Sequence, residues 1–141
     1  MQNNIALFDQ YVAQIFGRLY EHFPIPIALD ACQLTGHHDV DEYARPIDAQ
    51  GSLSQPFQVC KATIDWLIES GHLRVKDGNT YGYTDCVLTA KGLEVLKSVP
   101  DSVQVKTALG EKLVAALQRG ATEIATELGK TAVRLGAGIV G

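Results

Sequence analysis

The stretch that decides the fold is Thr63-Ile64-Asp65-Trp66-Leu67-Ile68-Glu69-Ser70-Gly71-His72-Leu73-Arg74-Val75. Its first part is apolar at helical spacing, and Gly71 follows where that spacing stops. Glycine just past the last helical residue is a common helix terminator. The residues after Gly71 alternate between apolar and basic side chains, which is typical of a half-buried strand. The stretch therefore predicts a long helix that runs directly into a strand.

The long helix begins at about residue 54, where Ser54 or Gln55 can cap it. Pro56 occupies the first turn, where its missing N–H is harmless. Apolar side chains then recur every three or four residues and predict a buried stripe, which consists of Phe57, Cys60, Ile64, Leu67 and Ile68. We interpret the thiols of Cys32, Cys60 and Cys86 as small core groups rather than as oxidation sensors.

A β-hairpin is predicted after the long helix. His72–Lys76 form its first strand, Asp77-Gly78-Asn79 its turn and Thr80–Leu88 its return strand. Thr89 then caps a further helix, which Pro100 closes.

The start of the chain predicts another long helix, from about Asn4 to His22, with one broad apolar face. Prolines follow it and disfavour helix at the residues before them, so residues 24–29 are predicted as a short edge strand. Asp30 is the expected N-cap of a short helix over residues 31–35.

Residues 37–55 lack periodicity and are predicted to form a long surface loop, with one helical turn near residues 41–45. The loop contains the sequence His37-His38-Asp39-Val40-Asp41-Glu42, in which all residues but one are of metal-ligating types. Adjacent residues rarely face one point, whereas metal ligands must do so. We therefore interpret these side chains as a solvated polar loop and predict no metal site.

The end of the chain has a helical period from Val105 onward. Its leucines and isoleucine recur close to a heptad seam with small residues in the gaps: Leu109, Leu113, Leu117, Ile124, Leu128 and Leu135. The pattern predicts a helical extension to about Leu135 that packs on a partner chain.

The composition is that of a folded protein, with 141 residues, 46% hydrophobic and 20% charged. It excludes disordered, collagen-like and disulfide-stapled classes, and the three cysteines are expected to be reduced. The first residues lack the positive region of a secretory signal, and no apolar run approaches the ~18 residues of a membrane span. We therefore expect a cytoplasmic protein without a membrane partner.

The formal net charge is −4, and residues 1–50 account for it with two basic and seven acidic side chains. The rest of the chain is close to neutral. Phosphate binding depends on cations, so a role in nucleic-acid binding must rest on a local patch.

The predicted order of elements resembles that of the winged helix-turn-helix superfamily. Residues 63–75 resemble its recognition helix and wing, and Val87-Leu88-Thr89-Ala90-Lys91-Gly92-Leu93-Glu94-Val95-Leu96 resembles the segment after the wing in MarR-like and PadR-like regulators. The resemblance covers about residues 5–98. It implies a mainly α fold with a small β-hairpin wing (α+β): a winged helix-turn-helix domain over residues 1–100, with 37–55 as an insertion, and a helical C-terminal extension over 101–141. Because such regulators often dimerise through appended helices, it also implies a homodimer.

The same resemblance implies a DNA-binding transcriptional regulator, in which the exposed face of the long helix enters the major groove. Two side chains of that face would read base edges, and basic residues of the wing would hold phosphates. The predicted DNA-binding residues are Gln58, Lys61, Ala62, Arg74, Lys76 and Asn79.

The alternative is a winged-helix protein-interaction module that binds no DNA and uses Asp65 and Glu69 of the same helix. Trp66, Tyr81 and Tyr83 are interpreted as packing residues; a pocket for an unknown small-molecule effector is the other interpretation. The sequence has no nucleophile elbow, no complete phosphate loop and no carboxylate pair in an apolar setting. We therefore predict no enzyme, no catalytic residue and no cofactor.

Overall fold

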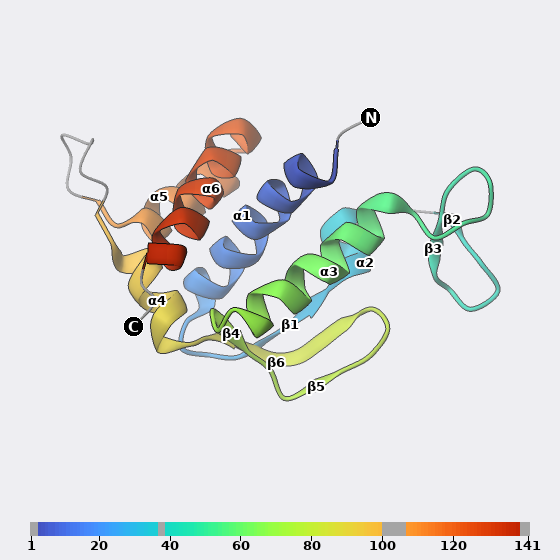
Figure 1. The fold of residues 1–141 in the computed structure, drawn as a ribbon, viewed down its shortest axis with the longest axis horizontal. Helices are drawn as coiled ribbons and strands as arrows, with labels where there is room; N and C mark the ends of the chain where they lie inside the picture. The colour runs from blue at the N-terminus through green and yellow to red at the C-terminus, as the bar shows by residue number, and fades with distance from the viewer. Residues whose placement is uncertain (1–2, 37–38, 100–106, 139–141) are drawn as a thin grey trace.

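The structure is a computed structural model that describes residues 3–36, 39–99 and 107–138. Within these residues it is mainly helical with small antiparallel sheets (Figure 1). The helices are α1 (Asn4–His22), α2 (Ala31–Thr35), α3 (Gln55–Glu69), α4 (Ala90–Lys97), α5 (Leu109–Gln118) and α6 (Thr122–Gly138). The strands are β1 (Ile27–Asp30), β2 (Asp39–Val40), β3 (Pro46–Ile47), β4 (Leu73–Arg74), β5 (Asp77–Gly78) and β6 (Gly82–Leu88).

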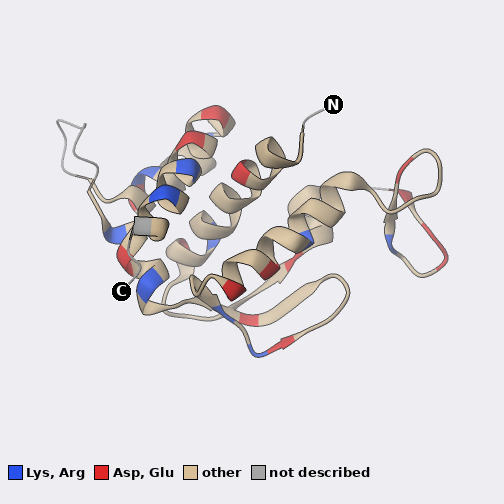
Figure 2. Ribbon diagram, in the orientation of Figure 1, with Lys and Arg blue, Asp and Glu red and all other residues tan. Residues whose placement is uncertain are grey.

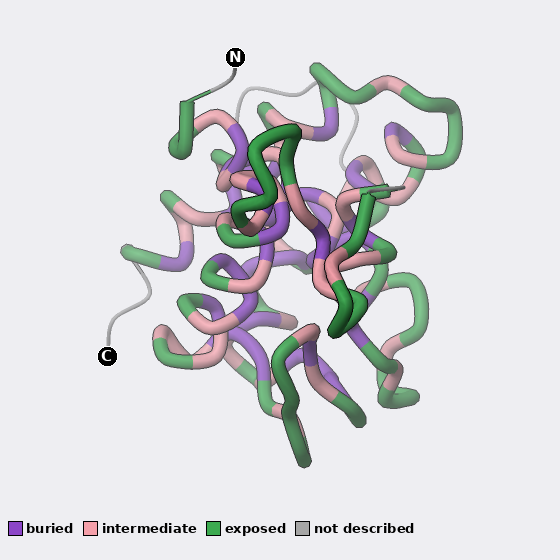
Figure 3. Tube along the Cα trace, turned by 90° about the vertical axis from the view of Figure 1, so that its right-hand side faces the viewer, coloured by how far each residue is buried: buried purple, intermediate pink, exposed green. Residues whose placement is uncertain are grey.

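Helix α1 is the centre of the core. It packs against α3 on one side and against α5 and α6 on the other (Figure 1). Its side chains Val12, Ile15 and Phe16 are 0% exposed. Leu67 of α3 and Leu113 of α5 belong to the same buried cluster. Figure 3 shows buried segments mainly in the interior and exposed ones at the outside of the molecule. The C-terminal helices therefore share one core with the elements before them; the predicted boundary at residue 100 lies outside the described residues.

Side-chain caps start the helices where the sequence predicts them. The Asn3 side chain accepts a hydrogen bond from the Ala6 N–H, and the Asp30 carboxylate accepts one from the Cys32 N–H at 2.7 Å. Ser54 Oγ caps α3 through the Phe57 N–H at 3.2 Å. Each cap satisfies an N–H that has no partner within its helix. The bounds predicted for α1 and α2 are confirmed, and Ser54 is the cap of α3.

The main sheet has the strand order β1–β6–β4, with β5 also paired to β6. The predicted hairpin exists, but its turn is displaced. Asp77 and Gly78 are themselves paired with β6, and the chain reverses at Asn79, whose side-chain oxygen accepts hydrogen bonds from the Tyr81 and Gly82 N–H groups. An asparagine side chain that binds the backbone two residues on favours a turn at its own position, which explains the shift. The edge strand predicted over residues 24–29 begins later than expected: β1 starts at Ile27, after the prolines.

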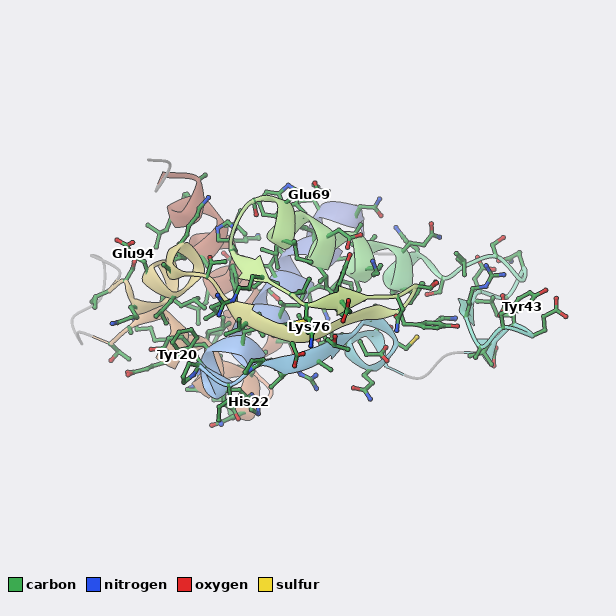
Figure 4. All side chains as sticks on the ribbon, turned by 90° about the horizontal axis from the view of Figure 1, so that it is seen from below. Tyr20, His22, Tyr43, Glu69, Lys76 and Glu94 are labelled. Carbon is green, nitrogen blue, oxygen red and sulfur yellow. The ribbon has the colours of Figure 1, made fainter. Side chains whose placement is uncertain are left out.

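The segment predicted as a loop, residues 37–55, contains a second, two-stranded sheet (Figure 1). We call residues 39–53 the arm. Asp41 nucleates its turn: one carboxylate oxygen accepts hydrogen bonds from the N–H groups of Tyr43 and Arg45, and the other is 2.8 Å from Arg45 Nε. The prediction of an irregular loop is therefore wrong for strands β2 and β3. The arm projects from the body with Tyr43 at its far end (Figure 4), and the Tyr81 hydroxyl donates to the Tyr43 carbonyl at 2.6 Å.

The first leucines of the C-terminal pattern pack within the protein's own core rather than on a partner chain. Leu109 and Leu113 are 0% exposed, because α5 packs on α1. The helical stretch is divided at Gly120, which has a φ of +73°, and α6 extends to Gly138. Only part of the predicted seam is therefore free for a partner, and its exposed member is Ile124 at 48%. Homodimerisation stays a prediction.

Candidate functional site

The candidate site is the solvent-facing surface of α3 together with the β4–β5–β6 hairpin beside it. The exposed side chains of α3 are Gln58, Ala62, Trp66 and Glu69. Val59, Lys61 and Asp65 are half-buried at the edges of the same face. The buried stripe Phe57–Cys60–Ile64–Leu67 holds the helix against the core, which confirms the predicted stripe except for Ile68, which is half-buried.

Two of the residues predicted to read DNA are engaged within the protein. The Gln58 side-chain amide donates to the Leu53 carbonyl at 2.9 Å. Lys61 Nζ is 3.1 Å from Asp65 Oδ1 and 3.3 Å from the Tyr83 hydroxyl, and it also lies 4.5 Å from the centre of the Tyr83 ring. Tyr83 Oη in turn donates to Asp65 at 2.5 Å. The three side chains form a closed network that ties the hairpin to α3.

The network decides what charge Lys61 presents. Burial lowers the pKa of Lys61, but hydrogen bonds to Asp65 and Tyr83 outweigh burial and raise it above its ordinary value. The hydrogen bond to Asp65 likewise raises the pKa of Tyr83. The ammonium is therefore charged and the phenol neutral at neutral pH. The ammonium charge is balanced by Asp65, so it is poorly placed to attract a phosphate.

The other predicted DNA-binding residues fall into separate places. Arg74 and Lys76 are exposed residues of the hairpin segment and have no ion pair within the described residues. Figure 4 shows Lys76 on the hairpin. Asn79 is used in the turn, as described above. Ala62 lies on an apolar wall of α3 and carries no polar group. The structure thus leaves two free cations of the predicted set.

Residues 54–88, which form α3 and the hairpin, are slightly acidic as a whole. They contain three cations against four carboxylates: Lys61, Arg74 and Lys76, and Asp65, Glu69, Asp77 and Asp85. Figure 2 shows acidic residues on the C-terminal half of α3 and on the hairpin. A surface of this charge does not attract a polyanion over distance.

An apolar groove lies between the start of α1 and α3. Its volume is about 450 Å³, and its walls are Asn4, Ile5, Phe8, Val59, Ala62, Thr63 and Trp66. Ile5 is 71% exposed and Trp66 41% exposed. Phe8 meets Trp66 edge to face, with ring centres 5.2 Å apart. Bulky apolar side chains that remain in water next to one another mark a binding surface more often than a stable free surface.

Sequence reasoning treated Trp66 as a packing residue and missed this groove. A signal was present: Val59, Ala62 and Trp66 are spaced three and four residues apart, outside the buried stripe. That spacing places them on a second apolar face of the same helix. The contribution of α1 could not be foreseen, because Ile5 and Phe8 fit its core-facing pattern equally well.

A buried histidine supports Trp66, one of the residues that line the groove. The His72 ring stacks under Trp66, with ring centres 6.2 Å apart and planes at 17°. Ser70 Oγ donates to the Leu67 carbonyl and lies 2.8 Å from His72 Nδ1. The imidazole and the hydroxyl group therefore form a hydrogen bond. The other ring nitrogen, His72 Nε2, is buried with no hydrogen-bond partner in the described part of the chain.

The stability of the protein is expected to fall as the pH is lowered through the range in which free histidine titrates. Burial, and then the charge of Lys91, lower the pKa of His72 below its ordinary value of 6.5. Below that pH the unfolded chain binds a proton more readily than the folded chain, so unfolding is favoured. Urea unfolding between about pH 7 and about pH 5 measures the loss.

A matched pair of variants isolates this effect. His72→Gln keeps a polar group near Ser70 but does not titrate, so it should flatten the pH dependence in that range. His22→Gln removes an exposed histidine of α1 and should leave the dependence intact. Equal pH dependence in the wild type and in His72→Gln would contradict the assignment to His72.

Among the described residues, the buried cysteines and the metal-ligating types of side chain form no further reactive site. Burial raises the pKa of Cys60 to about 12 and that of Cys86 to about 11, so neither thiol is a reactive thiolate. No three His, Cys, Asp or Glu side chains in residues 3–36, 39–99 and 107–138 are grouped as metal ligands need. His37 and His38 lie outside those residues.

No protein-family model, curated protein or solved structure matches this chain. Among the helices of the described residues, none has the length and apolar character needed to cross a membrane.

Proposed function

We propose that the protein is a protein-interaction module of winged-helix architecture, which contacts its partner through the exposed face of α3. The architecture is supported by the chain order α1–β1–α2–α3–β4–β5–β6, with β2 and β3 of the arm between α2 and α3. The antiparallel strands β4, β5 and β6 follow the long helix, and β6 also pairs with β1. In this interpretation α3 occupies the place of the recognition helix, the hairpin is the wing, and the arm is an insertion between α2 and α3.

The observation that carries the function is the chemistry of the α3 face. Where a DNA-reading helix presents cations and free amides, this helix presents Ala62, Trp66 and Glu69, and its lysine is neutralised by Asp65. An aromatic residue beside an apolar groove, rimmed by polar groups, is the usual make-up of the centre of a protein interface. The exposed aromatic ring, the apolar groove and the free carboxylate of this face therefore suit contact with a protein better than contact with DNA.

DNA binding is the second candidate function, because Arg74 and Lys76 are exposed and unpaired within the described residues. A DNA-binding domain commonly neutralises ~6–10 phosphates. Two free cations are too few unless a dimer doubles them. This candidate therefore depends on the homodimer that the C-terminal sequence predicts.

One set of proteins separates the two functions. The full chain, Glu69→Lys and the double variant Arg74→Ala/Lys76→Ala are compared for retention of proteins from a cell extract and for binding of random-sequence duplex DNA. We expect a protein partner whose retention is lost with Glu69→Lys and kept with the double variant, and no DNA complex at about 150 mM salt. A DNA complex at that salt which the double variant abolishes would overturn the interaction module in favour of DNA binding.

A further inference from the structure

We infer that the groove between α1 and α3 binds an amphipathic helix of another protein, one that carries bulky apolar side chains on one face and lysine or arginine beside them. This inference rests on the proposed function and names the partner's chemistry. The shape of the groove and the carboxylates beside it support this inference.

The shape of the groove suits a helix. Two helices form its walls, and the exposed apolar contacts run from Ile5 of α1 across to Trp66 of α3. A volume of about 450 Å³ lies within the ~300–1,000 Å³ range of pockets that take ligands with several bulky groups. Helices recognised in grooves insert apolar side chains at spacings of three, four and seven residues. Trp66 is held between Phe8 and His72, so its side chain needs little further ordering when the partner's side chains enter the groove.

Charged side chains beside the groove favour a basic partner. On the α3 side, Glu69 follows the groove residue Trp66 by one helical turn, is exposed and has no ion pair within the described residues. Further back on the same helix, Lys61 and Asp65 neutralise each other at 3.1 Å. On the α1 side, Ile5 also borders a hollow that Glu123 and Glu127 line.

In that hollow Lys130 pairs with Glu127 at 3.1 Å. Glu123 has no ion pair among the described residues. The uncompensated charges on both sides of the groove are thus carboxylates, and the complementary partner is cationic.

The same charges argue against a second copy of this chain as the occupant. A second copy that docked through the same groove would bring its own Glu69, Glu123 and Glu127 to a surface that already carries these carboxylates, so like charges would meet. The exposed apolar residue of α6, Ile124, is likewise flanked by Glu123 and Glu127. A basic helix from a different protein meets no such repulsion.

The test uses synthetic peptides and the single tryptophan of the chain, Trp66. The probe is a peptide of leucine and lysine without tryptophan, long enough for about five helical turns, with leucine spaced three and four residues apart. One control peptide has the same composition in shuffled order, and another has glutamate in place of every lysine. Binding of the amphipathic basic peptide to the full chain should saturate and shift Trp66 emission to shorter wavelength, because the peptide removes water from the ring.

Two variants with the same added charge locate the binding. Ala62→Arg fills the exposed wall of the groove and should weaken binding by about tenfold or more. Ala115→Arg, exposed on α5 on the other side of α1, should bind as the wild type does. Both substitutions are at exposed positions, and thermal unfolding verifies that each variant folds. Ile5→Ala, which removes an apolar contact without adding charge, should weaken binding severalfold.

Three results would overturn the inference: equal affinity for the basic and acidic peptides, equal effects of Ala62→Arg and Ala115→Arg, or an emission shift that depends on the concentration of the protein alone. The last result would assign the groove to a second copy. If a partner retained from the extract is lost with Glu69→Lys but the basic peptide does not bind, the partner chemistry is wrong while the interaction module stands.

Discussion

Replacing Gly92 with alanine is expected to lower the free energy of unfolding by about 3 kcal/mol. Gly92 is buried in the first turn of α4, and a Cβ at this position would lie 2.2 Å from the carbonyl oxygen of His72. That oxygen is backbone, and it already accepts a hydrogen bond from the Thr89 N–H at 3.0 Å. Neither group can move without separating α4 from the end of α3.

The sign of this effect makes it diagnostic. In an exposed helix, alanine is more favourable than glycine by about 1 kcal/mol, so a loss of stability can only come from the close approach. Urea unfolding measures it, with Glu94→Ala at an exposed position of the same helix as the control. A Gly92→Ala variant as stable as the wild type would mean that the first turn of α4 does not lie against the His72 carbonyl group.

Replacing Gly136 with alanine is expected to cost about 2 kcal/mol, because a Cβ there would lie 2.3 Å from His72 Nε2. Here the obstacle is a side chain. The ring is fixed by Trp66 above it and by Ser70 at Nδ1, so it cannot turn away freely. The alanine methyl group would therefore displace the last turns of α6 from the core.

Combining the two glycine substitutions with His72→Ala distinguishes the two obstacles. His72→Ala removes the ring but keeps the carbonyl group, so Gly136→Ala should cost much less in that background, whereas Gly92→Ala should cost as much as before. Urea unfolding measures the free-energy cost of each glycine substitution with and without His72→Ala, and the two double-mutant cycles are then compared. Equal costs of Gly136→Ala with and without the His72 ring would contradict the packing of α6 on this residue.

The parts of the fold that the sequence predicts well are those set by neighbouring residues. Asp30 and Ser54 cap their helices because the acceptor lies two or three residues from its donor, and the apolar stripe of α3 follows from its own spacing. The hairpin turn predicted at Asp77-Gly78-Asn79 is displaced, because Asp77 and Gly78 pair with β6 and the Asn79 side chain stabilises a turn that begins at Asn79. The arm escaped prediction because its strands are too short to show alternation and depend on the Asp41 turn.

The candidate site shows the same division. The neutralisation of Lys61 by Asp65 was accessible from the sequence, since the two are one helical turn apart. The third member, Tyr83, comes from a strand and is brought there only by the pairing of β6 with its neighbours. Likewise Gly92 stands out in sequence as part of Thr89-Ala90-Lys91-Gly92, but the atom that requires a glycine belongs to His72, twenty positions earlier. Contacts between distant segments decide these features, and no local pattern encodes them.

The arm gives the molecule a natural site for protein engineering. Its strands pair with each other, and Ile47 pairs with Leu53. Among the described residues, the hydrogen bond that links it to the hairpin runs from the Tyr81 hydroxyl to the Tyr43 carbonyl. Since its tip contributes nothing to the buried core, a change of length at Glu42–Ala44 leaves the packing of α1, α3 and α6 untouched. An affinity tag or a dye inserted there reports on the protein without occupying either the groove or the hairpin cations.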